Sequence, residues 1–585
     1  MWYLSIVVVA TIMLYYELYV GGSVAPNVIA GFGMTFRFYV YISVVGNAVG
    51  AFGSLLAGIT DRWGRANLTA YGLVLTALLV LVGIPNAHDK WTFSILTVVI
   101  GLVEGVILVA TPALIRDFSP QLGRASAMGF WTLGPVVGSL VVAIVSSNTL
   151  SHLVAWQDQY IICGIAGIVV GVIALFGLRE LSPRLRDQLM VSIRDRALIE
   201  ARARGIDVEA SLRRPWRQMM HLDVVGSAFA ISVFLLIYYA AVGFFVIYFE
   251  SLYGYSPSKA NSIGNWFWAF DGGVLIIVGI ISDRVRVRKP FMVVGAVGAI
   301  VMTIIFANLG AKTSYSTFVV VISILAACLA IAYAPWMASF TETVEKHNPA
   351  LTATGLAVWG WILRVVVAVS SLIIPFVISS MTPLVTYGGQ VSTLAAQYAP
   401  QLATAQAIDP KTQAALNANP SDTTALATAV GEIAKTFNVS QTVATSRLEA
   451  LAAVPKADLQ FLNEHAAEVT TAAVAAPGQW KTWWWVCIAG EALFVRIENP
   501  GAAFVLFGAE FRIEKLEGQT WIPAPESPDV CWVHRDPGQR GHVRRSVARD
   551  QYGGRSSYQT PSVLKARQKR CFAPSSSREA SMSGV

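Results

Sequence analysis

The sequence predicts an all-α integral membrane protein with twelve transmembrane helices in two parallel six-helix repeats and an external helical insert before the last helix. Three observations lead to this fold class. Of the 585 residues, 55% are hydrophobic and 13% are charged, and that charged fraction is about half of the value typical of soluble proteins. The apolar residues form runs of membrane-spanning length, and the two halves of the chain share motifs in the same order.

The apolar runs define the predicted helices. The segment 224–249 carries no ionisable side chain except tyrosines. A helix rises about 1.5 Å per residue, so such a run crosses a hydrocarbon core of about 30 Å. The predicted spans are 2–24, 38–59, 67–86, 91–115, 125–147, 157–178, 224–249, 262–282, 290–309, 315–339 and 351–379. A twelfth, from Trp480 to Val495, is short for a span.

The distribution of basic residues predicts the orientation. If the loop after the second span is cytoplasmic, the cytoplasmic loops contain 19 Lys and Arg residues and the short external loops contain 4. Cytoplasmic loops of membrane proteins are enriched in these residues. We therefore expect a multi-pass protein of the cell (cytoplasmic) membrane with both termini in the cytoplasm. The net charge of +8 lies largely in loops and in the tail, and it does not indicate nucleic-acid binding.

Two long connections interrupt the pattern of short loops. The predicted parts are an N-terminal six-helix bundle (1–178), a cytoplasmic linker (179–222), helices 7–11 of the C-terminal bundle (223–379), an extracytoplasmic helical insert (380–479), a short or imperfect twelfth helix (480–507) and a disordered or aberrant cytoplasmic tail (508–585). Within the insert, "DPKTQAAL" and "NPSDTTAL" place helix-start residues before helical stretches. The insert is either a tolerated insertion, a partner-binding segment or a cap over the cavity.

Three pairs of motifs recur in order in the two halves. "ITDRWGR" matches "ISDRVRVRK", "ATPAL" matches "YAPWM", and "AMGFWTLGP" matches "GLAVWGWIL". The matched residues are Asp61 and Asp283 (222 apart), Pro112 and Pro335 (223 apart), and Trp131 and Trp359 (228 apart). Six helices return the chain to its starting side, so the two copies have the same orientation, with a solute site between them.

The loop "GITDRWGR" (58–65) resembles the signature loop of the major facilitator superfamily, and "GIISDRVRVRK" (279–289) resembles its second copy. The resemblance covers about residues 1–379 and the last helix. It implies a secondary transporter whose halves rock about a central site. The implied gating residues are Asp61, Arg62, Gly64, Arg65, Asp283 and Arg284.

The resemblance also implies how this gate works. Asp61 would face the N-terminus of a helix from the other half, where the helix dipole attracts a negative charge. Gly64 permits the tight turn. Alternatively, Arg62 and Arg65 are ordinary cytoplasmic anchors.

Five ionisable residues lie within the apolar runs. They are Glu17, Glu104, Asp271, Arg364 and, in the doubtful twelfth helix, Glu491. Charged groups at this depth are costly and are often functional. Because desolvation disfavours the anion, some of these carboxyls are expected to bind protons reversibly. Arg364 remains charged and could bind an anionic substrate. The alternative is that these residues form structural bonds between helices.

The fifth span contains Gly134, Pro135 and Gly138. This part resembles the glycine-proline motif of the superfamily's antiporters. We interpret it as a kink for helix packing. Tyr15, Tyr16, Trp266, Trp268, Trp359 and Trp361 could stack on a substrate or serve only in packing.

These observations favour proton-coupled symport of a small polar organic solute, with carboxylates among the candidates. The alternatives are a proton-driven drug or metabolite efflux antiporter and a membrane sensor built on a transporter fold. The expected partners are the solute, protons and the lipid bilayer, with no nucleic acid, no cofactor and no metal, and we expect a monomer. The sequence contains no motif for a phosphate-binding loop, a zinc cluster or an activated nucleophile, so an enzyme is not expected.

Overall fold

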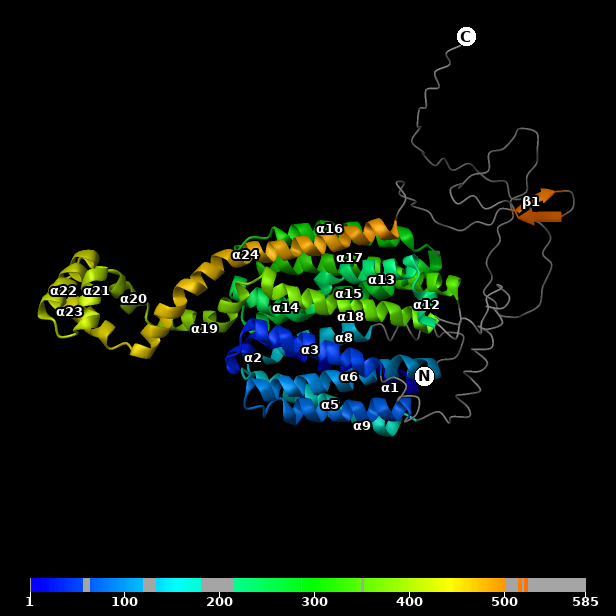
Figure 1. Ribbon diagram of the computed structural model, residues 1–585, viewed down its shortest axis with the longest axis horizontal. Coiled ribbons are helices and arrows are strands. Elements are labelled where there is room, and N and C mark those ends of the chain that lie inside the picture. The colour runs from blue at the N-terminus through cyan, green and yellow to red at the C-terminus, as the bar shows by residue number, and fades with distance from the viewer. Residues whose placement is uncertain are drawn as a thin grey trace, which may run out of the picture. The chain divides into compact units, whose positions relative to one another are not determined.

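The computed structural model describes residues 2–55, 64–118, 133–179, 215–285, 287–348 and 352–499, together with two strands at 514–517 and 520–523. Over the first six of these ranges the chain is helical (Figure 1). The two strands, β1 (Glu514–Glu517) and β2 (Thr520–Pro523), pair in antiparallel fashion. This hairpin lies in a tail for which the sequence predicted no ordered element.

The helices of the first half of the chain are α1 (Trp2–Ser23), α2 (Ala25–Gly31), α3 (Phe36–Leu55), α5 (Arg65–Leu78), the π-helical turn η1 (Leu79–Gly83), α6 (Lys90–Phe118), α8 (Gly134–Thr149) and α9 (Trp156–Gly177). Those of the second half are α12 (Pro215–Met219), α13 (Leu222–Phe234), α14 (Leu236–Tyr253), α15 (Pro257–Val285), α16 (Lys289–Ala307), α17 (Tyr315–His347) and α18 (Thr352–Val377). The remaining helices are α19 (Met381–Gln397), α20 (Ala399–Gln406), α21 (Pro410–Ala418), α22 (Thr423–Phe437), α23 (Gln441–Ala452) and α24 (Lys456–Glu498).

Nine helical segments of the described residues are long and apolar enough to cross a membrane, and ten if α2 and α3, which meet at 115°, count as one broken span. The apolar helix α8 has only 16 residues in its described part. The count of twelve spans therefore stays a prediction. The predicted span 224–249 is not one straight helix, because α13 ends and α14 begins at Leu235.

Helices pack in pairs within each half of the chain. In the first half, α3 packs on α6, α5 on α9 and α1 on α8; in the second, α15 packs on α17, α16 on α24 and α13 on α18. The halves meet where α8 contacts α15 and where α3 contacts α18. In Figure 1 the blue helices of the first half and the green helices of the second run side by side along one direction.

Small residues bring α3 and α6 into backbone contact. A Cβ atom at Gly105 of α6 would lie 2.1 Å from the Gly50 carbonyl oxygen of α3, which is closer than any side chain can approach. Such contacts are typical of helix packing in membranes. The hydrophobic effect does not drive helices together in lipid, so close van der Waals packing between small residues stabilises the pair. This packing fixes the position of α6 at Gly105 and therefore also the position of Glu104, the residue before it.

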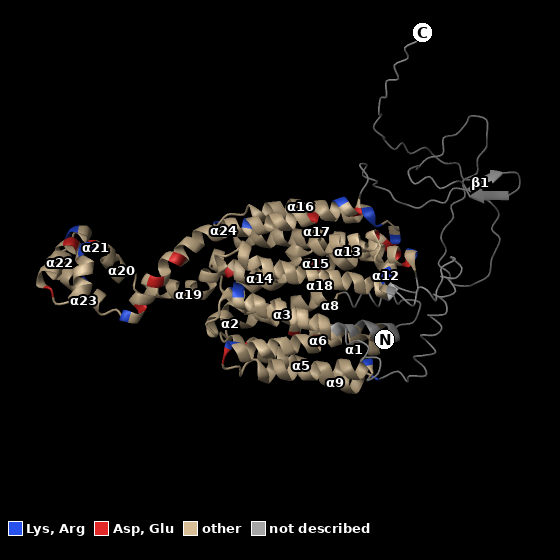
Figure 2. Cartoon of the chain, viewed as in Figure 1, with Lys and Arg blue, Asp and Glu red and all other residues tan. Residues whose placement is uncertain are grey.

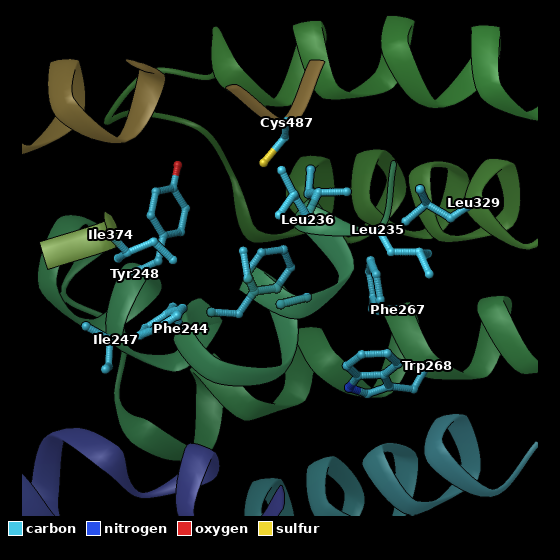
Figure 3. Packing of buried hydrophobic residues seen from close by; sticks show 14 of the residues in the cluster. Leu235, Leu236, Phe244, Ile247, Tyr248, Phe267, Trp268, Leu329, Ile374 and Cys487 are labelled. Carbon is cyan, nitrogen blue, oxygen red and sulfur yellow. The ribbon is translucent and has the colours of Figure 1, made fainter. Parts of the chain in front are cut away.

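Charged side chains are rare along the spanning helices and gather at their ends and in the insert (Figure 2). At the start of α6, Asp89 accepts hydrogen bonds from the Thr92 hydroxyl and from the Trp91 and Thr92 backbone amides. These bonds hold the pKa of Asp89 below its usual range, the Thr92 hydroxyl bond most of all. Inside the second half, Leu236, Phe267 and Cys487 from three different helices belong to one apolar core (Figure 3).

The insert contains a small helical unit with its own core. Ile408, Ala429, Ile433 and Ala444 are buried together there. We call α20–α23, residues 399–452, the headpiece. The helix starts indicated by the sequence are present, since Asp409 caps α21 and Asp422 caps α22 through hydrogen bonds to backbone amides. The helix that follows, α24, has 43 residues and ends at Glu498, three residues beyond the predicted end at Val495.

Candidate functional site

The first copy of the gating loop is only partly described. Asp61 and Arg62 lie outside the described residues. Gly64 precedes α5 with a φ of 91°, a backbone conformation that residues with a side chain rarely adopt. Arg65, the first residue of α5, is 9% exposed. This conformation is compatible with the tight turn that the sequence predicts, and the rest of that turn lies outside the described residues.

The second copy forms an ion-pair network around a residue that the sequence analysis missed. Arg288 Nη1 lies 2.6 Å from Asp283 Oδ1, and Arg288 Nη2 lies 3.3 Å from Glu342 Oε1 of α17. Arg284, the predicted member of the motif, is exposed. Arg288 lies 223 residues after Arg65. This offset, the same as for the repeated prolines, was the available signal.

Two of the predicted acids lie inside the first half. Glu17 of α1 is 3% exposed and Glu104 of α6 is 1% exposed. Neither oxygen of either carboxyl has a hydrogen-bond partner, and the two groups lie within electrostatic range of each other. A buried polar group without a partner is costly, so both side chains require an explanation beyond packing.

The space for Glu17 is provided by a glycine on a neighbouring helix. A Cβ atom at Gly167 of α9 would lie 2.2 Å from Glu17 Oε1 and 2.8 Å from the Ala77 Cβ atom. Only glycine leaves room for the carboxyl at this point.

Arg364 lies among tyrosines where helices of both halves meet. The guanidinium of Arg364, on α18, is within electrostatic range of Tyr15 on α1 and Tyr239 on α14. All three side chains are partly exposed. Tyr15 and Arg364 lie in the middle of long helices, and Tyr239 lies in the first turn of α14. The three helices thus bring a cation and two hydroxyl groups together.

Asp271 belongs to the same group. This carboxyl on α15 is 3% exposed and lies within electrostatic range of Tyr238 and Tyr333. We call Tyr15, Tyr19, Tyr238, Tyr239, Tyr333, Asp271 and Arg364 the central cluster.

The sequence analysis named Tyr15 in this cluster and missed four of its tyrosines. A signal was present in the sequence, because "YY" at 15–16 recurs at 238–239 with the offset of 223 that separates the repeated prolines.

Gly134 and Gly138 pack against α1 beside the central cluster. A Cβ atom at Gly138 would lie 2.6 Å from the Tyr15 Cβ atom, and one at Gly134 would lie 2.6 Å from Thr11 Cγ2. Pro135 is in the first turn of the described part of α8. The predicted kink would involve residues before 133, which lie outside the described residues.

The two halves are joined by hydrogen bonds at one end of the bundle. Asn261 Nδ2 of α15 donates to the Ser23 carbonyl oxygen of α1 at 2.9 Å. Ser258 Oγ donates to the Ser147 carbonyl oxygen at 2.5 Å, and Asn265 Nδ2 donates to Ser147 Oγ at 2.9 Å. These donors are in the N-terminal turns of α15, while Asp283 lies at its other end.

A cavity of about 40 Å³ lies behind these bonds, lined by Tyr19, Ser139, Asn261 and Trp268 among others. A cavity needs only about 10–15 Å³ for one water, so this space suits a few waters and is too small for an organic solute. Among the described residues, no three His, Cys, Asp or Glu side chains gather in a way that could hold a metal ion.

Curated relatives match this chain over part of their length. The efflux pump radE of Floropilus chiversii is 24% identical over 266 residues, which cover 43% of this chain and 48% of the pump. Sugar phosphate exchanger 3 of Mus musculus is 21% identical over 271 residues, covering 42% of this chain and 54% of the exchanger. The chain thus spans about half the length of these relatives.

Among solved structures, the chain is similar to a bacterial homologue of the human lysosomal transporter Spinster, in an inward-facing and occupied conformation. The TM-score is 0.53 at 15% identity, and the match covers 86% of this chain and 98% of the homologue. At this identity the likeness shows the fold alone.

The family of the chain follows from the comparison with family models. The model described as Major Facilitator Superfamily matches residues 7–375, which include both signature loops, the buried acids of the first half and the central cluster. With more than half of its length matched, this multi-pass membrane protein belongs to the Major Facilitator Superfamily.

Proposed function

We propose that the protein is a secondary active transporter, not an enzyme, that carries a small polar organic solute together with protons by alternating access. Carboxylates are the favoured solute class. It acts in the cell membrane as a monomer with both termini in the cytoplasm. The observation that carries this proposal is Arg364 among partly exposed tyrosines, at the place where helices of both halves meet.

The helix contacts support two parallel six-helix repeats. The contacts α3–α6, α5–α9 and α1–α8 have the counterparts α15–α17, α16–α24 and α13–α18. If the second half repeats the first, α15 corresponds to α3 and α18 corresponds to α8. The repeat then relates the contact of α8 with α15 to the contact of α18 with α3. Both contacts are present, so the interface is also consistent with the repeat. A solute site on this axis is accessible from either side as the halves rock.

The chemistry of the central cluster supports an anionic or polar solute. Arg364 keeps its charge at all physiological pH values and can hold a carboxylate through two parallel hydrogen bonds. The surrounding tyrosines offer hydroxyl groups for polar contacts and ring faces for apolar ones.

The buried acids support proton coupling. Glu17 and Glu104 have no hydrogen-bond partners and lie within electrostatic range of each other. Two like charges in so dry a place are strongly disfavoured, and a proton on at least one carboxyl removes the repulsion. Release of that proton on one side of the membrane would bias the rocking equilibrium.

The gate would lie at the cytoplasmic end. Gly64 and Arg65 begin α5 there, and Asp283, through Arg288, is tied to α17. Asp61, Arg62 and Arg284 complete the proposed gate. At the other end of α15, Asn261 and its neighbours bond the two halves together, which supports a conformation that opens to the cytoplasm.

Proton-driven efflux is the second candidate. Gly134 and Gly138 place α8 directly on α1, as the resemblance to the antiporter motif implies, and one relative is named as an efflux pump. The direction in which the solute moves relative to the proton separates the two candidates.

Purified protein in proteoliposomes with an imposed pH gradient tests the proposal. The panel contains organic acids, sugars and hydrophobic cations. Accumulation of an organic acid with inward proton flow, lost in Arg364→Ala, is the expected result. Extrusion of a hydrophobic cation would favour the antiporter. Binding of a panel compound without any movement would favour a sensor and contradict transport.

A further inference from the structure

One buried acid has no role in the proposed cycle. Glu491 lies on α24 in the second half and is 0% exposed. Its Oε1 atom accepts a hydrogen bond of 2.9 Å from the Thr303 hydroxyl of α16, while its Oε2 atom has no partner. The titratable groups that face it are the thiols of Cys328 on α17 and Cys487 on its own helix. No cationic group is among these neighbours, and an ionised carboxylate is costly in such surroundings.

The helix of Glu491 repeats the pattern of α9. On α9, Trp156, Cys163 and Gly167 follow one another at intervals of seven and four residues. On α24, Trp480, Cys487 and Glu491 follow at the same intervals. The offset between the two helices is 324, which exceeds the offset of 223 by 101, about the length of the insert 380–479.

The matching position in the first half also carries a carboxyl, supplied by a different helix. Gly167 leaves room for Glu17 of α1, whose carboxyl would touch a Cβ atom there. The residue that corresponds to Glu17 at an offset of 223 is Ala240 of α14. At this pair of positions each half therefore has one small residue and one glutamate. The glutamate is on α1 in the first half and on α24 in the second.

The surroundings of the two carboxyls also correspond. Helix α1 packs on α9 as α14 packs on α24. The Cys163 thiol lies within electrostatic range of Glu17, and the Cys487 thiol lies within electrostatic range of Glu491. The equivalent place in each half thus holds a buried carboxyl next to a cysteine.

We propose that Glu491 is a second proton-binding site, in the C-terminal half, that binds and releases one proton in each transport cycle. The proton forms an O–H bond at Oε2, taken from one aqueous phase, and leaves to the other phase after the halves have rocked. The anion left behind keeps the Thr303 hydrogen bond on Oε1. A permanently protonated structural glutamate would use its O–H group as a donor, and Oε2 has no acceptor. The inference rests on the proposed transport function for its place in the cycle.

The protonation of Glu491 can be measured without a solute. Infrared difference spectra of the full-length protein in lipid, recorded from acidic to alkaline pH, report the carbonyl stretch of protonated carboxyls. We expect a band that is lost on alkalinisation in the wild type and is missing at all pH values in Glu491→Gln. Thr303→Val removes a bond that stabilises the anion, so it should move this loss to higher pH. A Glu491 band that stays constant with pH, or that never appears, overturns the proposal.

The place of Glu491 in the cycle is tested by the ratio of protons to solute. With an organic acid identified by the panel, the pH gradient that balances a known solute gradient gives this ratio. The ratio should fall by one proton in Glu491→Gln, and an unchanged ratio overturns the inference. A wild type whose uptake ignores the pH gradient would instead contradict the proposed function. If Glu491→Gln does not fold, the shift of the band in Thr303→Val decides the assignment.

Discussion

Single residues in this protein show how a membrane interior accommodates groups that lipid excludes. Glu17 and Glu104 are buried without hydrogen-bond partners, and a glycine on another helix makes room for one of them. Such positions are hard to retain for packing alone, because an apolar side chain of similar volume would cost nothing in desolvation. Their burial therefore supports the proposal that they bind protons in the transport cycle.

Replacement of Gly167 by alanine tests the space around Glu17. The new methyl group would lie 2.2 Å from Glu17 Oε1, so the carboxyl must move. We expect a loss of stability of about 1–3 kcal/mol, as for other overpacked sites, and a loss of proton-driven accumulation. Thermal unfolding and uptake in proteoliposomes measure both. Gly226→Ala on α13, where a Cβ atom would meet nothing within 4 Å, is the matched control and should leave both unchanged.

Arg288 is expected to matter for transport more than for stability. Its partners Asp283 and Glu342 have side chains that are 69% and 55% exposed, and exposed ion pairs contribute about 0–1 kcal/mol. Arg288→Ala should therefore change the free energy of unfolding by less than about 1 kcal/mol and slow the transport rate several-fold. A wild-type transport rate in Arg288→Ala would contradict a role of this network in the proposed gate. Lys435→Ala, at an exposed lysine of the insert, is the control and should leave the transport rate unchanged.

The buried acids and Arg364 could be found from the sequence, because a charge inside an apolar run stands out against its neighbours. The tyrosines of the central cluster could not be found in this way, since tyrosine is common in membrane helices. Arg288 lies close to Arg284 and Arg286 in the sequence, and besides its offset of 223 from Arg65 it is the ion pairs that distinguish it.

At the scale of the element, α15 carries different chemistry at its two ends. Its first turns present Ser258, Asn261 and Asn265 to α1 and α8 of the other half, and its last turn carries the ion pair of Asp283. The spacing of three and four residues places the first three side chains on one face of the helix. One helix thus takes part in the closed end and in the proposed gate.

Loss of the Asn261 side chain should open the closed end. Asn261→Ala removes the bond to the Ser23 carbonyl oxygen, a net loss of about 1 kcal/mol, so an outward-open population should grow roughly five-fold. Spin labels at Asn86 and Lys312, in a background without native cysteines, would report it as a longer distance. Asn47→Ala, which removes a similar bond within one helix, should leave the distances unchanged. Unchanged distances in Asn261→Ala would exclude this bond as a closing contact.

Apolar run length located the helices but not all of their boundaries. The break between α13 and α14 at Leu235 falls within an unbroken apolar run, where hydropathy carries no information on backbone angles. The insert is a clearer case, because Asp409 and Asp422 cap helices where the local sequence indicated helix starts. The length of α24 was missed because its polar first half and apolar second half looked like two separate elements.

At the scale of the whole molecule, the headpiece is built as a separate unit. Its core consists of its own side chains, and the chain enters and leaves it at neighbouring points. The Tyr398 hydroxyl bonds Asp458 Oδ2 at 2.9 Å, which joins the end of α19 to the start of α24. The bond with the Asp458 carboxylate raises the pKa of Tyr398.

Removal of the headpiece should therefore leave the membrane part intact. A short Gly-Ser linker in place of residues 399–452 spans the gap, because Tyr398 is already in contact with Asp458 at the start of α24. We expect normal expression and thermal stability, with uptake within two-fold of the wild type, measured in the same proteoliposome assay. Failure of this variant to fold would show that the headpiece supports the bundle, and folded protein without uptake would assign it a role in transport.

Two truncations at the C-terminal end of α24 form a matched pair. Glu498 Oε1 accepts hydrogen bonds from the Ser227 hydroxyl and, at 3.2 Å, from Trp336 Nε1. A chain that ends at Asn499 keeps these bonds and should unfold at the wild-type temperature. A chain that ends at Val495 loses the acceptor of the Ser227 hydroxyl and one of the two acceptors of Trp336 Nε1, which keeps Ser227 Oγ at 3.0 Å. The loss of these hydrogen bonds, worth about 1 kcal/mol each, should lower the unfolding temperature. Equal melting of the two truncations would contradict this role of Glu498.

The contacts at the two ends of α15 differ in how they respond to dissolved ions. Hydrogen bonds from amides and hydroxyls to carbonyl oxygens, such as those of Asn261 and Ser258, are almost insensitive to ionic strength. The bonds of Arg288 join full charges that water reaches, and such pairs weaken as the Debye length shrinks from about 10 Å at 0.1 M to about 3 Å at 1 M electrolyte. In the proposed cycle, concentrated electrolyte would act on the step that breaks the Arg288 contacts and spare the step that breaks the Asn261 contacts, so ionic strength would separate the two steps in time.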